Sequence, residues 1–107
     1  MAKYLLKIKY SADGIGGVMK DGGSARRSAA EQLAKAVGGS VEAFYYAFGD
    51  DDAYAICDMP DNKAAATVAM TVSATGRISI STVPLLTVDE MDAIAAGNKL
   101  SYTPPGS

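Results

Sequence analysis

The chain has 107 residues, of which 49% are hydrophobic and 21% are charged, and its formal net charge is -2. This length and composition favour one globular domain and exclude a disordered chain. The near balance of charge provides no basic surface for nucleic acid or anionic membranes. The chain has one cysteine and no histidine, so we expect no zinc site, no intrachain disulfide and no cofactor.

The N-terminal segment is interrupted by lysines and resembles neither a signal peptide nor a membrane span. We therefore expect a cytoplasmic protein without nucleic-acid or membrane partners. Cys57 lies in an apolar, strand-like run, which favours a buried thiol over a nucleophile.

The first half of the chain shows a strand followed by helical segments. Residues 3–10 alternate with a period of two, which predicts a strand. Residues 11–20 are rich in turn formers and helix-capping types, which predicts a short helical turn weakened by glycine. Ser24 is the predicted N-cap of a helix that extends to about Val37 and is ended by Gly38 and Gly39.

Two β-prone segments then flank a glycine-led acidic turn. Residues 41–48 and 53–59 predict a hairpin whose turn, residues 49–52, places three carboxylates at one edge of the sheet. Asp61 is positioned to cap a second helix over residues 62–73, and a fourth strand is expected at residues 77–83.

The C-terminal part begins with strong helix-start signals. Thr87 and Glu90 fit a capping box, and Leu86 and Met91 fit a hydrophobic staple, so a third helix is expected from about residue 88 to residue 97. We assign residues 1–97 to a single domain and residues 98–107 to a flexible tail.

The order of these elements, β-α-β-β-α-β, predicts an α+β fold of the ferredoxin-like, split β-α-β type. Its four-stranded antiparallel sheet would carry both long helices on one face. Apolar residues occur on both faces of the strands, as at Leu5 and Leu6, so we expect a second subunit to cover the other face. The predicted assembly is a homo-oligomer, at least a dimer, that resembles a dimeric α/β barrel with a cavity between its sheets.

Several short motifs together make the chain similar to the GYD-domain family of small bacterial proteins, over about residues 1–96. The motifs are Tyr10-Ser11 with Gly14, Gly38-Gly39, Phe44-Tyr45, the turn from Gly49 to Asp52, Pro60-Asp61 and the run from Thr87 to Met91. The resemblance implies a ferredoxin-like domain but no particular reaction, because the function of the family is not established.

The naming turn of the family differs at one position in this chain. Gly49 and Asp52 match the turn, whereas Asp51 stands where the family has a tyrosine. If that tyrosine takes part in a reaction in other members, Tyr46 or Tyr54 would have to replace it in this chain. A related turn occurs in the ligand-binding domain of leucine-responsive regulators. The chain lacks their helix-turn-helix, so this similarity implies at most a stand-alone binding or sensing module.

The candidate site residues fall into two groups. Asp52 as a base and Tyr54 as an orienting donor are the catalytic candidates, although acidic residues at a hairpin are more often solvated. The candidates for ligand binding are cations and phenols from the strands: Lys7, Lys9, Tyr10, Tyr46 and Arg77. Such lysines often only protect a sheet from aggregation, and strand tyrosines are usually core or interface residues.

The preferred hypothesis is a homo-oligomer that binds a small anionic or aromatic metabolite between its sheets. The first alternative is a cofactor-free enzyme of the dimeric-barrel kind, such as an isomerase or oxygenase. The second is a purely structural assembly subunit. No metal site is predicted in any of them.

Overall fold

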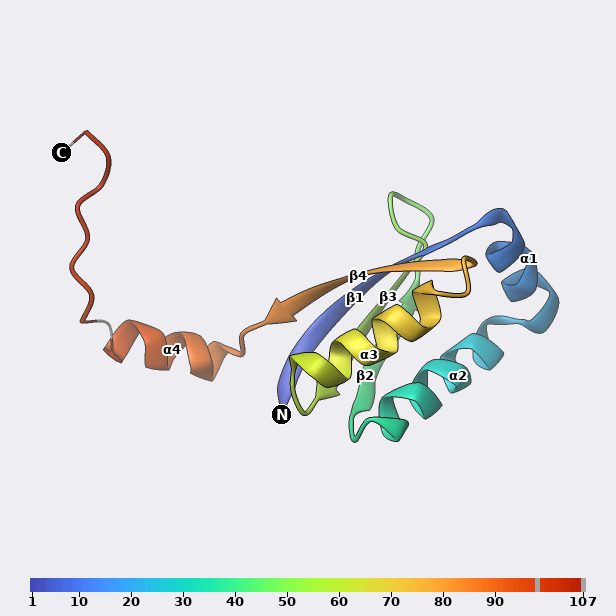
Figure 1. Cartoon of the computed structure of the whole chain (residues 1–107), viewed down its shortest axis with the longest axis horizontal. Helices are drawn as coiled ribbons and strands as arrows, with labels where there is room; N and C mark the ends of the chain where they lie inside the picture. Colours follow the sequence, from blue (N-terminus) through green and yellow to red (C-terminus); the bar gives the residue numbers. More distant parts are fainter. Residues whose placement is uncertain (98, 107) are drawn as a thin grey trace.

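The computed structural model describes residues 1–97 and 99–106 of the chain. Its elements follow in the order β1 (Ala2–Tyr10), α1 (Ala12–Asp21), α2 (Gly23–Ala36), β2 (Ser40–Tyr46), β3 (Ala53–Met59), α3 (Asn62–Ser73), β4 (Ile78–Leu85) and α4 (Val88–Gly97). Figure 1 shows the first seven elements gathered in one body, with α4 lying away from it.

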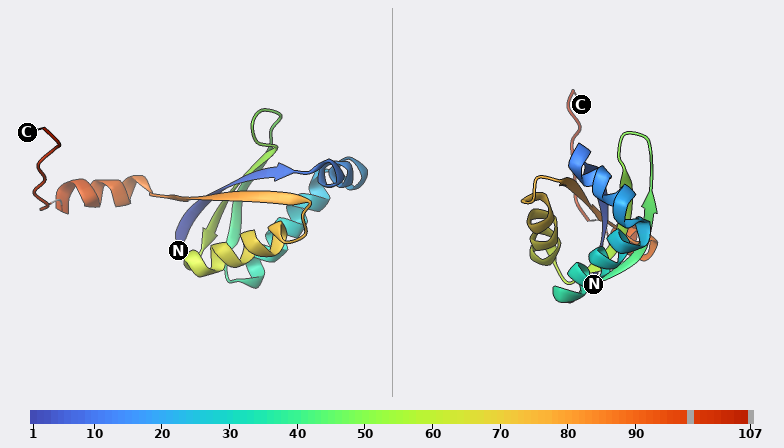
Figure 2. Two further views of the ribbon diagram at one scale, coloured as in Figure 1. Left: turned by 45° about the horizontal axis from the view of Figure 1, so that its top comes forward. Right: turned by 90° about the vertical axis from the view of Figure 1, so that its right-hand side faces the viewer.

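The strands form one four-stranded sheet in the order β2-β3-β1-β4, and every neighbouring pair is antiparallel. The long helices α2 and α3 both lie on one face of this sheet (Figure 2). The predicted ferredoxin-like α+β fold is therefore confirmed. None of the described helices covers the other face of the sheet, which we call the open face.

The core lies between the sheet and the two long helices. Alternate residues of β1 are buried there because successive side chains of a strand point to opposite faces. The same holds for β3, and the helices contribute mostly small residues. The buried core consists of Tyr4, Leu6, Ile8, Ala34, Ala53, Ala55, Cys57, Met59, Ala65 and Val68.

Side-chain caps fix the starts of three helices. The Ser11 hydroxyl accepts from the Gly14 amide, and the Asp61 carboxylate accepts from the Ala64 amide at 2.8 Å. The predicted capping box of α4 is also confirmed. The Thr87 amide donates to the Glu90 carboxylate at 2.9 Å, and the Glu90 amide donates to the Thr87 hydroxyl at 3.0 Å.

The start of α2 differs from the prediction. Ser24 is not its N-cap, because the helix already begins at Gly23 and Gly22 takes the cap position without a side-chain hydrogen bond. The predicted end is right. Gly38 adopts a φ of 82°, which favours glycine, and the amides of Gly38 and Gly39 bond back to Lys35 and Ala34 in a Schellman arrangement.

An irregularity in β2 changes which of its residues face the helices. The pairing with β3 shifts between Val41 and Ala43, so the extra residue, Glu42, puts Val41 on the same face as Phe44. Simple alternation had placed these two on opposite faces. The strand also ends at Tyr46, earlier than expected, and a bond from the Ala47 amide to the Asp52 carbonyl closes a longer loop.

The fourth strand extends past its predicted end at residue 83. Pro84 lies inside β4, which continues to Leu85. This is possible because β4 is an edge strand, where a residue without an amide proton is tolerated.

The open face is organised in rows that cross all four strands. The registers place one apolar row across the sheet, with tyrosine, lysine and serine side chains in the next row. The apolar row consists of Ala43, Ile56, Leu5 and Val83, and the polar row consists of Tyr45, Tyr54, Lys7 and Ser81.

No residue of α4 is buried. The predicted tail, residues 98–107, begins and ends at residues outside the described part, and residues 99–106 form no helix or strand. Of the helices that are described, none has the length and apolar content to cross a membrane.

We predict opposite effects for two alanine substitutions within α1. A Cβ at Gly14 would lie 2.2 Å from the Arg77 carbonyl oxygen, whereas one at Gly16 would meet nothing within 4 Å. Gly14→Ala should lower the free energy of unfolding by roughly 1–3 kcal/mol because the backbone must shift. Gly16→Ala should raise it by about 0.5–1 kcal/mol through lost chain entropy. Urea denaturation measures both, and equal stabilities would contradict the close approach of α1 to β4.

Candidate functional site

The residues predicted from sequence to bind a ligand lie on both sides of the sheet. Lys7 and Lys9 occupy positions of β1 on the open face, opposite Ser81 and Ser79. The remaining three lie on the side of the helices, at the end of the sheet where β1 finishes and β4 begins. They are Tyr10, Tyr46 and Arg77. The structure therefore does not bring the five predicted residues together at one surface.

The acidic turn contributes two carboxylates with different surroundings. The Asp52 carboxylate accepts the Tyr10 amide at 2.8 Å, and the Asp52 amide donates to the Ile8 carbonyl, so Asp52 ties the turn to β1. Asp51 is only 6% exposed. It accepts the Tyr54 hydroxyl at 3.0 Å and lies 3.8 Å from the Lys7 ammonium.

These contacts bear on the predicted catalytic pair. Tyr54 bonds to Asp51 and not to Asp52, and this hydrogen bond raises the pKa of the Tyr54 phenol because it stabilises the protonated form. The sequence prediction had treated Asp51 as a solvated turn residue. Its burial follows from the turn folding back against β1, which the local sequence does not reveal.

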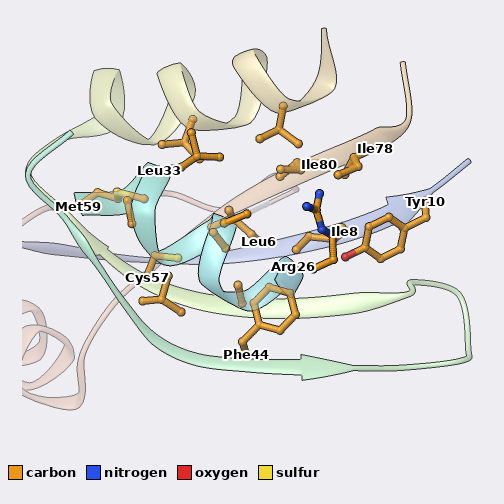
Figure 3. A pocket seen from close by; sticks show the side chains of 17 residues that line it. Leu6, Ile8, Tyr10, Arg26, Leu33, Phe44, Cys57, Met59, Ile78 and Ile80 are labelled. Carbon is orange, nitrogen blue, oxygen red and sulfur yellow. The ribbon is translucent and has the colours of Figure 1, made fainter. Parts of the chain in front are cut away.

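A partly open apolar cavity of about 110 Å³ lies between the sheet and the helices α2 and α3 (Figure 3). Its walls include larger side chains such as Leu33 and Phe44, but several positions carry only short ones, which leaves the space unfilled. The short residues are Ala29, Ala30, Ala34 and Ala55.

One charged side chain enters this cavity. Arg26 lines it together with Tyr10, and Figure 3 shows the guanidinium and the phenol oxygen at the same end. The Nε atom of Arg26 is buried and has no hydrogen-bond partner among the described residues. The ion pairs found in the described residues involve Lys3, Lys7 and Arg27 but not Arg26.

The same arginine also lines a larger, open groove of about 550 Å³, which we call the Arg26 groove. The groove is bounded by α1, α2, α3 and the start of β4. The groove adjoins the apolar cavity, because the two linings share Tyr10, Arg26, Leu33, Val72 and Ile78. Its polar lining combines cations, carboxylates and hydroxyls: Arg26, Arg77, Asp13, Asp21, Thr71 and Thr75.

Two tyrosines lie near Arg26, one bonded to the first turn of its helix and one beside it in the cavity lining. The Tyr46 hydroxyl donates to the Gly23 carbonyl at 2.8 Å, which ties β2 to the helical turn that carries Arg26. Burial raises the pKa of Tyr10 to about 12, while the positive charge of Arg26 acts in the opposite direction. Burial likewise raises the pKa of Tyr46. Tyr10 therefore keeps its proton at neutral pH and can act as a donor beside the guanidinium.

Arg26 was missed at the sequence level, although a signal was present. It precedes Ala29, Ala30 and Leu33 by three, four and seven residues, so it stands on the apolar stripe of α2. A charge at such a position is uncommon unless it is paired. Its neighbour Arg27 lies off the stripe and pairs with Glu31 at 3.4 Å.

Cys57 is a buried free thiol, as predicted. Burial raises its pKa to about 11, and the nearby Asp58 adds to the effect. Among the described residues, no group of three or more acidic or cysteine side chains is arranged to hold a metal ion.

We predict that the native Cys57 thiol resists alkylation. At about pH 8, iodoacetamide should modify the folded protein on the order of a hundredfold more slowly than the urea-unfolded chain, because only the thiolate reacts. Mass spectrometry over time measures both rates. Equal rates would contradict the burial of the thiol beneath the helices.

Comparison with known proteins gives one match. The family model described as the GYD domain matches residues 4–95. No curated protein and no solved structure matches the chain.

Proposed function

The chain belongs to the GYD domain family, and on the geometry of the Arg26 groove we propose that it is a homo-oligomeric protein that binds a small anionic metabolite. The ligand is a carboxylate with a compact apolar tail. Its head group sits at Arg26 and Tyr10, and its tail enters the apolar cavity.

The observation that carries this proposal is the buried Nε of Arg26 without a partner. A buried donor that loses its hydrogen bonds to water costs about 1–3 kcal/mol, and a charged group costs more. Such an arginine destabilises the folded protein unless a bound group supplies the missing hydrogen-bond acceptor. A bound carboxylate does so directly, because its two oxygens match the fork of donors on a guanidinium.

The cavity next to the guanidinium limits the tail of the ligand. Its volume is about 110 Å³, and an apolar cavity of about 150 Å³ in another protein is known to hold benzene. A branched chain of four or five carbons is therefore a suitable size. Leu6, Ile8 and Phe44 supply an apolar lining that favours such a chain over a sugar or a nucleotide.

The mixed charge of the groove allows for a second polar group on the ligand. Arg77 supplies a further cation, whereas Asp13 and Asp21 would attract an ammonium group. All three side chains belong to exposed residues, so water screens them more than it screens Arg26. The carboxylate is for this reason the group of the ligand that binding requires. Whether an amino group on the ligand adds to the affinity is tested by the experiment below.

Self-association is the second part of the proposal. The open face carries an apolar row, and Ile56 and Leu5 in its centre remain partly exposed in a single chain. A second copy that covers this row would remove it from water. Lys7 and Lys9 lie at the margin of this contact in the proposal, where they would favour an acidic partner surface.

The enzyme alternative receives no comparable support. Asp52 is engaged by the backbone amide of Tyr10, and the Tyr54 hydroxyl is engaged by Asp51.

We predict that Arg26→Met weakens ligand binding and stabilises the empty protein. Calorimetric titration with 4-methylpentanoate should give an affinity at least about tenfold weaker for Arg26→Met than for the native chain. Without ligand, the variant should gain about 1–2 kcal/mol in unfolding free energy, because the unsatisfied buried donor is gone. Titration with leucine, which differs by its α-amino group, measures the contribution of Asp13 and Asp21.

The matched control is Arg27→Met, which changes the adjacent arginine outside the cavity and should leave binding unchanged. Native protein that binds neither compound would contradict the proposed ligand class. Equal losses in Arg26→Met and Arg27→Met would contradict the assignment of the head group to Arg26.

A further inference from the structure

The helix α4 presents an apolar stripe that the described residues of its own chain leave exposed. Val88, Met91 and Ile94 are 78%, 54% and 51% exposed, and Ala95 lies between them on the same side of the helix. Figures 1 and 2 both show α4 beyond the end of β4, away from the open face of its own chain. Only residues 86 and 87 join β4 to α4, which leaves little chain for a return onto the same sheet.

The charges of α4 all have one sign. Asp89, Glu90 and Asp92 belong to the helix, and it contains no lysine or arginine. At 100° of rotation per residue around the helix axis, Asp92 lies next to Val88 at the border of the apolar stripe. Asp89 lies farther from the stripe around the same axis.

The open face carries three lysines, and two of them are already paired within the chain. Lys3 is paired with Glu42 and Asp58 at 3.0 and 2.9 Å, and Lys7 lies 3.8 Å from Asp51. Lys9 is exposed, and it takes part in none of the ion pairs of the described residues. The apolar row of the sheet runs between Lys3 and Lys7, and Lys9 lies two residues farther along β1.

We propose that α4 of one copy packs across the open face of a second copy, whose own α4 returns the contact. The stripe of α4 meets the apolar row, and the acidic border of α4 faces Lys7 in the next row of the open face. A helix of ten residues is about 15 Å long, and four strands spaced about 4.8 Å apart span roughly the same distance. The inference rests on the self-association proposed above and names the element that forms it.

A reciprocal exchange suits the symmetry of such a pair. In a two-fold dimer each copy gives the same element and receives the same element, so both apolar surfaces are covered at once. The Arg26 groove lies on the helix-covered side of the sheet and is formed within one chain. Ligand binding therefore serves as an independent measure of correct folding.

The first test uses light scattering of the full chain and three glutamate variants. The native protein should have twice the 11.0 kDa mass of the chain. Met91→Glu and Ile94→Glu should each weaken dimerisation by more than about tenfold, because the contact would then bury an unpaired charge. Ala96→Glu, on the opposite side of the same helix, is the control and should remain dimeric. Neither residue of the stripe is buried in its own chain, so these substitutions leave the domain fold intact.

A second test locates the contact. Val83→Cys protein, with the new thiol in the apolar row, is mixed with Ile94→Cys protein and oxidised mildly. Because Cys57 is buried, the new thiols are the ones expected to react, and a disulfide-linked heterodimer should form. Met19→Cys on α1, at a residue that is 81% exposed, is the control partner and should give none.

The outcomes separate this inference from the proposed function. A native dimer that survives both Met91→Glu and Ile94→Glu overturns the exchange of α4 but keeps self-association. A native monomer overturns both. Monomeric Met91→Glu or Ile94→Glu protein that still binds 4-methylpentanoate supports the exchange and the ligand site together, and equal cross-linking of the Val83→Cys and Met19→Cys proteins overturns the proposed contact.

Discussion

The strand β1 determines the position of every other feature because it is hydrogen-bonded on both sides, to β3 and to β4. Its strict alternation sends Tyr4, Leu6 and Ile8 to the helices. It sends Leu5 and the lysines to the open face. The two registers that start from β1 then assign faces to β3 and β4, so one strand of nine residues divides the molecule into a covered side and an uncovered side.

On the covered side of the sheet, small side chains leave room for a cavity. Ala29, Ala30 and Ala55 satisfy the apolar pattern of a core but leave a cavity, and Arg26 extends into that space from the same stripe of α2. A core of larger residues would have been more stable and would have excluded a ligand. The uncovered side shows the complementary situation, in which the described part of the chain leaves apolar groups partly exposed.

Most of the fold could be predicted because the decisive signals are local. Residues 53–59 and 62–73 are strand and helix as predicted, and the caps at Asp61 and Thr87 depend on neighbours within three residues. The bulge at Glu42 and the burial of Asp51 could not be predicted, since both depend on strands that are distant in sequence. For the same reason the sequence did not show that the five candidate ligand residues lie on two different faces of the sheet. Arg26 was visible as a charge on an apolar stripe, but only the packing of α2 against the sheet shows that its Nε has no partner.

The reciprocal cap of Thr87 and Glu90 has a kinetic consequence. A helix as short as α4 is marginal in isolation, because its first turn must be ordered before any propagation. The cap satisfies two of the amides at that turn within the chain itself, which lowers the cost of nucleation. Two copies that meet would then each present an α4 that is already helical. The rate of pairing would depend on diffusion and orientation more than on helix formation.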